Sequence, residues 1–134
     1  NISKGDLALL RGDQYLESIF NSYVPQILKS LQLEISASNT ALIGSSMGGL
    51  STLYAAHKHP NKFKTALALS PHWLIGGDSL VHRTIKELPA PGSHKVWMSR
   101  GTKALDAQYK PFQDLADELM IQKGYRKDLW EEKG

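Results

Sequence analysis

Cysteine is absent from this chain of 134 residues. Its absence excludes disulfide bonds, a thiol nucleophile and cysteine metal sites. No apolar run approaches the roughly 20 residues that a membrane-spanning helix needs, so we expect no membrane span. No signal peptide is visible, and the compartment stays open between cytoplasm and export, because cysteine-free chains occur in reducing and oxidising places.

A large excess of one charge is also lacking. The chain has 16 Lys and Arg against 13 Asp and Glu, a net charge of +3. The basic residues are scattered, and even the group Lys123, Arg126 and Lys127 is interrupted by Gly124 and Tyr125. Proteins that bind nucleic acid gather positive charge on one face, so we expect no nucleic-acid partner. The hydrophobic content of 41% is typical of one globular domain with a real core.

The most informative segment is a short apolar run that ends in Gly-x-Ser-x-Gly. Residues 41–43 predict a strand, Gly44–Gly48 predict a sharp turn, and a helical pattern follows without a gap. This strand–turn–helix context lifts the central serine above the sheet edge as a nucleophile, and the first N–H of the helix points at a developing oxyanion. The segment predicts Ser46 as nucleophile, Met47 as oxyanion donor and Ser45 as part of the substrate site.

The glycines of this segment are expected to serve close packing. We predict that a side chain at Gly44 or Gly48 would clash where the chain turns, and that Gly49 lets the helix approach the sheet. A plain Gly- and Ser-rich loop is the alternative, but it needs neither the strand before nor the helix directly after. We expect no phosphate loop, because no Gly-Lys-Ser/Thr follows the glycines.

Strands and helices alternate along the whole chain. The patterns predict a helix over 16–31 with a kink at Pro25 and strands over 41–43, 63–69 and 95–99. They also predict a helix over 47–59, a short helix that follows 76–78 and ends at 85, and a helix that begins at 109 or 111 and ends at 123. This order predicts an α/β fold, a parallel sheet flanked by helices. Function should lie at the carboxyl ends of the strands, where the loops 44–48, 70–78 and 101–106 meet. Residues 128–134 are considered as the beginning of a fourth strand.

Several of these segments together resemble the serine esterases of the α/β-hydrolase superfamily related to esterase D and to enterochelin (siderophore) esterases. They are Gly44–Leu50, the block from Phe63 to Leu69-Ser70-Pro71-His72-Trp73, Gly101-Thr102 with Leu105-Asp106, and the helix with Tyr15-Leu16 and Val24-Pro25. The resemblance extends over most of the chain. It implies a three-layer α/β/α domain, a Ser–acid–His triad, a small-molecule ester substrate and no metal or organic cofactor.

The resemblance also assigns site residues. Ser46 matches the nucleophile, and Asp106 matches the acid best, because it follows the third strand; some relatives carry a glutamate where this chain has Lys103. Asp78 is the second candidate, and a helix N-cap is the alternative role of Asp106. We place His72 and Trp73 in the substrate site, because they follow the second strand.

The histidine of the triad poses a problem. The chain order in this superfamily is Ser, acid, His, but no histidine follows Asp106. His72 is the one histidine that leaves a strand beside Ser46, so it is the alternative candidate for the base, in a chain order unlike that of the superfamily. His57 and His59 should lie about 16 Å or more away along the helix, and surface positions are expected for His82 and His94. We therefore expect that residues 1–134 form a single partial domain that lacks the first strands and a C-terminal segment with the histidine.

The function that follows is carboxylic-ester hydrolysis through an acyl-enzyme on Ser46. The 134-residue chain alone is expected to be inactive, because a serine hydroxyl without its base stays protonated. The alternative is a non-catalytic module of the same fold that binds a partner or has a structural role. Exposed sheet edges should make such a partial domain prone to self-association.

Overall fold

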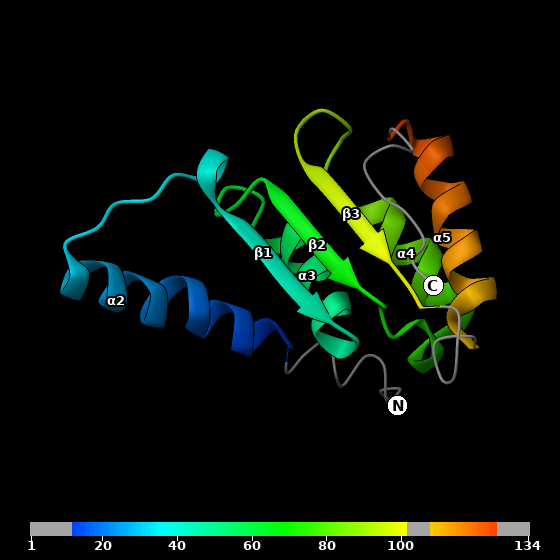
Figure 1. Cartoon of the computed structure of the whole chain (residues 1–134), viewed down its shortest axis with the longest axis horizontal. Helices are drawn as coiled ribbons and strands as arrows, with labels where there is room; N and C mark the ends of the chain where they lie inside the picture. The colour runs from blue at the N-terminus through cyan, green and yellow to red at the C-terminus, as the bar shows by residue number, and fades with distance from the viewer. Residues whose placement is uncertain (1–11, 102–107, 126–134) are drawn as a thin grey trace.

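The computed structural model describes residues 12–101 and 108–125. Strands and helices alternate in it as the sequence predicts (Figure 1). In chain order the elements are a helical segment over 12–18, the π-helix η1 (Ile19–Tyr23), α2 (Val24–Leu31), the 3₁₀-helix η2 (Ala37–Asn39), β1 (Ala41–Ser45), α3 (Met47–Lys58), β2 (Thr65–Leu69), η3 (Trp73–Ile75), α4 (Gly77–Glu87), β3 (Lys95–Ser99) and α5 (Lys110–Lys123). The segment 128–134, considered as a fourth strand, lies outside these residues.

The three strands form one parallel sheet in the order β1-β2-β3. In its register Ile43 pairs with Leu67, and Leu67 pairs with Trp97. The α/β class, a parallel sheet flanked by helices, is therefore confirmed. Because the strands are parallel, their carboxyl ends meet at one edge, and the segments that follow them are brought together there.

The two faces of the sheet differ. Ala66, Ala68, Val96 and Met98 are buried on one face, and α3 and α4 lie behind the sheet on that side (Figure 1). On the other face the side chain of Ile43 is 60% exposed. The described residues thus supply helices for one face, and the third layer of the expected α/β/α arrangement is not formed by them. Self-association through the outer strands stays a prediction.

The first helix packs on the body through its first half. Leu16 is buried, and the ring of Phe20 stacks on Phe63 with centroids 5.9 Å apart. Before Pro25 the helix widens into a π-turn, in which the Val24 N–H donates to the Ile19 carbonyl. The chain stays helical beyond Pro25, which is tolerated near the start of α2 because it has no N–H to satisfy.

The second half of this helix extends away from the sheet (Figure 1). The apolar side chains of Tyr23, Ile27 and Leu31 on this half are each more than half exposed. Periodicity identifies the apolar stripe and not what covers it. No helix in the described ranges is long and apolar enough to cross a bilayer.

The end of α5 is tied to the end of α4. The Lys123 ammonium donates to the carbonyls of Ile85, Lys86 and Leu88 at 2.9, 2.7 and 2.7 Å, at and just beyond the end of α4, where carbonyls lack partners from a following helical turn. Gly124 follows with a φ of 106°, the left-handed conformation that ends a helix, as predicted. These contacts fix α5 against α4, and the other end of α5 lies beside the candidate site.

His94, expected at the surface, is buried at the start of β3. Its Nε2 lies 3.0 Å from the Pro60 carbonyl and its Nδ1 lies 2.8 Å from the Ser93 hydroxyl. A neutral ring with the proton on Nε2 satisfies both contacts, donating to Pro60 and accepting from Ser93. Burial, together with the nearby Lys64 ammonium, lowers the pKa of His94.

A lowered pKa makes stability depend on pH. Because the unfolded chain then binds more protons than the folded chain, His94 stabilises the fold fully above the ordinary histidine pKa of about 6.5. That contribution is lost as the pH falls from there through the lowered folded value. We predict that the free energy of unfolding, measured by urea denaturation, decreases between pH 7.5 and pH 5, and that His94→Gln reduces this slope. His82→Gln, at an exposed position of α4, is the matched control; equal slopes in both variants would contradict the prediction.

Candidate active site

Ser46 forms the junction between β1 and α3. Its φ and ψ are 57° and −116°, a conformation that residues with a side chain rarely adopt. Its N–H donates to the Leu69 carbonyl at 2.9 Å, and its own carbonyl accepts from the N–H groups of Gly49, Leu50 and His72 at 3.0–3.2 Å. The backbone of Ser46 is thus held by β2, by α3 and by the segment after β2. Strained conformations persist where the surroundings over-determine them, and they cluster at functional sites.

The glycines around Ser46 have different roles. A Cβ on Gly44 would lie 2.1 Å from the Gly48 carbonyl oxygen, and one on Gly49 would lie 3.1 Å from the Leu69 carbonyl oxygen. Gly44 and Gly49 therefore allow α3 to approach the sheet, as predicted. The prediction for Gly48 was wrong, because a Cβ there would meet nothing within 4 Å. The clash at this turn is one-sided: the backbone of Gly48 is the obstacle that a side chain at Gly44 would strike.

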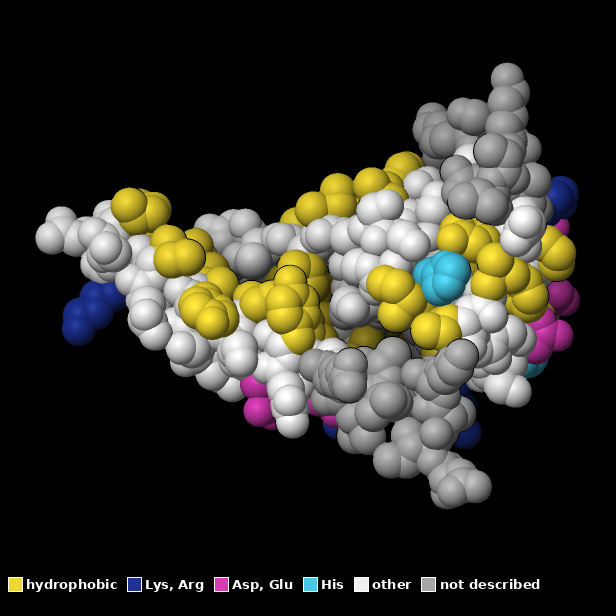
Figure 2. All heavy atoms as spheres, turned by 90° about the horizontal axis from the view of Figure 1, so that it is seen from below, with side chains coloured by type: hydrophobic (Ala, Val, Ile, Leu, Met, Phe, Trp, Pro, Cys, Tyr) yellow, Lys and Arg dark blue, Asp and Glu magenta, His cyan; other side chains and the backbone are white. Residues whose placement is uncertain are grey.

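The side chains of Ser45, Ser46 and Met47 are exposed at the carboxyl edge of the sheet. Met47 is the first residue of α3, and the first N–H groups of a helix have no partner within the helix. Together with the helix dipole they favour negative charge at this point. Figure 2 views the molecule from below and shows hydrophobic side chains gathered around a histidine on this face.

His72 lies at the same edge, since its N–H donates to the Ser46 carbonyl. Its Nδ1 is 2.8 Å from the Tyr109 hydroxyl, and the two rings meet edge to face. The contact with Tyr109 could not be found by sequence reasoning, because Tyr109 comes from the start of α5, 37 positions away. Within the described residues no histidine hydrogen-bonds to the Ser46 hydroxyl.

Trp73 is placed differently from the prediction. The side chain is fully buried in the core, and its indole N–H donates to the Gln113 side chain at 3.0 Å. Gln113 also contacts the Asp117 carboxylate at 2.9 Å. A side chain with no exposed surface cannot contact a ligand, so we do not carry Trp73 into the site. Gln113 could have been noticed, because it shares the buried stripe of α5 with Ala116 and Met120.

Of the two candidates for the acid of the triad, the structure describes only Asp78. Asp106 lies outside the described residues. Asp78 is exposed in the first turn of α4, where its carboxylate interacts favourably with the helix dipole. This interaction with the dipole of α4 explains an aspartate at position 78 without a catalytic role.

Solved structures share the fold of this chain. The enterobactin esterase FES from Shigella flexneri, in the presence of 2,3-dihydroxy-N-benzoyl-glycine, superposes with a TM-score of 0.70 at 18% identity over 89% of this chain and 32% of its own. A ferulic acid esterase superposes with a TM-score of 0.67 at 14% identity over 89% of this chain and 52% of its own. These identities establish the fold alone, that of the α/β-hydrolase-like esterases.

The sequence defines the family. Residues 11–132 match the family model described as "Putative esterase", and the chain belongs to this esterase family. The protein YbbA from Bacillus subtilis (strain 168), whose role is uncharacterized, is 30% identical over 93 residues, which are 69% of this chain and 36% of YbbA. The chain thus spans about a third of the length of YbbA and of the enterobactin esterase.

Proposed function

We propose that the protein containing this chain hydrolyses carboxylic esters through an acyl-enzyme on Ser46. The observation that carries the proposal is the conformation of Ser46: an exposed serine on a strained turn, between the end of β1 and the start of α3. A strained backbone conformation costs free energy, and it is usually retained where it serves a function. Membership of an esterase family supports the reaction class.

The chemistry follows from this placement. The Ser46 hydroxyl oxygen attacks the ester carbonyl carbon while its proton passes to a neutral imidazole. The carbonyl oxygen becomes an oxyanion, toward which the Met47 N–H and the dipole of α3 are directed. The bond to the alcohol oxygen then breaks, and the imidazolium returns the proton to the leaving alcohol. Water attacks the acyl-enzyme by the same route and releases the acid.

The remaining roles in the proposal follow the family order. Asp106 orients the imidazole, and the imidazole belongs to a histidine that comes after the acid in the whole protein. His72 and Ser45 flank Ser46 and contact the substrate: His72 through its ring, which Tyr109 fixes from the Nδ1 side, and Ser45 through its exposed side chain. The substrate is a small-molecule ester, and no cofactor takes part.

A fluorophosphonate probe tests the proposal directly. Such probes form a covalent bond with an activated serine, and peptide mass spectrometry of the labelled protein should locate the adduct on Ser46. Labelling should slow by orders of magnitude in Asp106→Asn, because loss of the orienting acid weakens the base, and should be little changed in Asp78→Asn. A large effect of Asp78→Asn alone would reverse the assignment of the acid.

One observation favours the non-catalytic alternative: no described histidine contacts the Ser46 hydroxyl. A serine without a base is no more reactive than a free hydroxyl. The fluorophosphonate experiment distinguishes the two functions, because complete absence of labelling in the protein that contains this chain would support a binding or structural module.

A further inference from the structure

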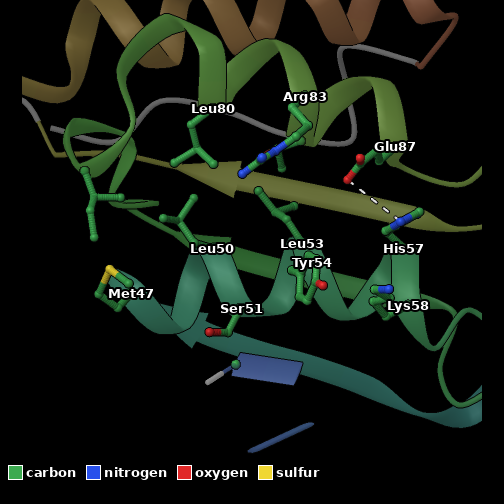
Figure 3. Close-up of a pocket in the computed structure, with 13 residues that line it drawn as sticks. Met47, Leu50, Ser51, Leu53, Tyr54, His57, Lys58, Leu80, Arg83 and Glu87 are labelled. Carbon is green, nitrogen blue, oxygen red and sulfur yellow. Dashed lines mark ion pairs between the residues drawn. The ribbon is translucent and has the colours of Figure 1, made fainter. Parts of the chain in front are cut away.

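A groove lies between α3 and α4. Figure 3 shows its walls: Leu50 and Leu53 of α3 face Leu80 of α4, and Met47 lies at one end. We call this cavity the α3–α4 groove; it has a volume of about 220 Å³. Ser51 on α3 and Thr84 on α4 are small, half-buried side chains on its opposite walls.

The two ends of the α3–α4 groove differ. At the far end the His57 Nε2 lies 3.8 Å from the Glu87 carboxylate, a contact that links α3 to α4 (Figure 3). At the near end Met47, which is 40% exposed, directly follows Ser46. Leu50, whose N–H donates to the Ser46 carbonyl, lies one helical turn further along the wall. The groove is therefore bridged at the far end, and its apolar near end begins beside the serine.

Charged side chains also line the groove, namely Lys58 of α3 and Arg83 and Glu87 of α4, whereas its apolar lining comes from Met47, Leu50, Leu53, Ile75 and Leu80. Burial and a hydrogen bond with Asp13 raise the pKa of Tyr54, so its hydroxyl remains protonated. The leucines contribute only apolar surface. An apolar cavity of about 150 Å³ holds one benzene molecule, so the α3–α4 groove has room for one ring with a substituent and not for a large chain.

We infer that the α3–α4 groove binds a ring-sized apolar group of the ester, on either its acyl or its alcohol side. This inference rests on the proposed function, since it takes Ser46 as the reacting residue. It follows from three observations on the groove: leucines on both walls, a volume that fits one ring, and an end formed by the residue next to Ser46. One methylene group more or less in a hydrophobic contact changes discrimination between ligands by about 10- to 200-fold.

Binding can be measured without turnover. The unreactive probe is 4-fluorobenzyl alcohol, titrated into the protein that contains this chain and followed by fluorine NMR. Thr84→Phe and Ser51→Phe fill the groove from opposite walls, and each should weaken binding at least about tenfold. Ser79→Phe, at an exposed position of α4 outside the groove, should bind like the wild type. Circular dichroism checks that each variant is folded, and unchanged binding in both folded groove variants would overturn the inference.

Turnover identifies which side of the ester enters the groove. With methyl acetate as the baseline, Thr84→Phe should lower kcat/KM about tenfold for benzyl acetate if the alcohol side binds, or for methyl phenylacetate if the acyl side binds. An equal effect on all three esters would overturn the inference. If Ser46→Ala leaves the turnover of methyl acetate unchanged, the proposed function fails, and the binding titration still decides whether the groove holds a ring.

Discussion

Replacing Ser46 with alanine should reduce ester hydrolysis by about 10⁴- to 10⁶-fold, the loss seen when a catalytic serine is removed from a triad. The substitution deletes one oxygen atom, and that hydroxyl makes no hydrogen bond within the described residues, so the fold should be unaffected. The measurement is kcat with 4-nitrophenyl acetate in the protein that contains this chain, together with its thermal melting midpoint.

Ser45 is the matched control for this substitution. It is the same residue type one position earlier and is also exposed, but it belongs to β1 and pairs in register with Leu69. Ser45→Ala should lower kcat by far less than Ser46→Ala. If Ser45→Ala were the damaging change and Ser46→Ala the mild one, the nucleophile would be misassigned and the conformation of Ser46 would need another explanation.

Most of the fold could be predicted, because its signals are local. The limits of β3 match the predicted strand over 95–99, and α5 stops before Gly124 as its pattern indicates. The π-turn at Ile19–Tyr23 could not be predicted, because it depends on how the helix accommodates Pro25. The exposure of Ile27 and Leu31 also escaped prediction, since a periodic stripe does not reveal whether another element covers it.

The candidate site also has one part that could be predicted from the sequence and one part that could not. The position of Ser46 follows from its neighbours in the sequence, so the strand–turn–helix pattern is enough to locate it. The contact of His72 with Tyr109 and the burial of Trp73 against Gln113 depend on how α5 docks beside η3, nearly 40 positions further along the chain. The α3–α4 groove is likewise made by two helices whose separation no local pattern encodes.

The two glycines that frame Ser46 should respond to alanine in opposite directions. A Cβ at Gly44 would lie 2.1 Å from the carbonyl oxygen and 2.4 Å from the carbonyl carbon of Gly48. Both are backbone atoms, so α3 itself must move away from β1. We expect Gly44→Ala to lower the free energy of unfolding by about 3 kcal/mol or more, at or above the upper end of overpacking effects, and to abolish hydrolysis because the turn at Ser46 is displaced.

Gly48→Ala should leave the free energy of unfolding unchanged or raise it by up to about 1 kcal/mol, because alanine favours a helix over glycine and its Cβ would meet nothing within 4 Å. Urea denaturation of both variants measures the difference. The double variant Gly44→Ala with Thr52→Ala separates the sources of the clash: the Thr52 hydroxyl would be 2.7 Å from the new Cβ, but the Gly48 backbone would be nearer. Removing that hydroxyl should therefore not restore stability. Recovery in the double variant would mean that the side chain, and not the close approach of α3 to β1, makes Gly44 necessary.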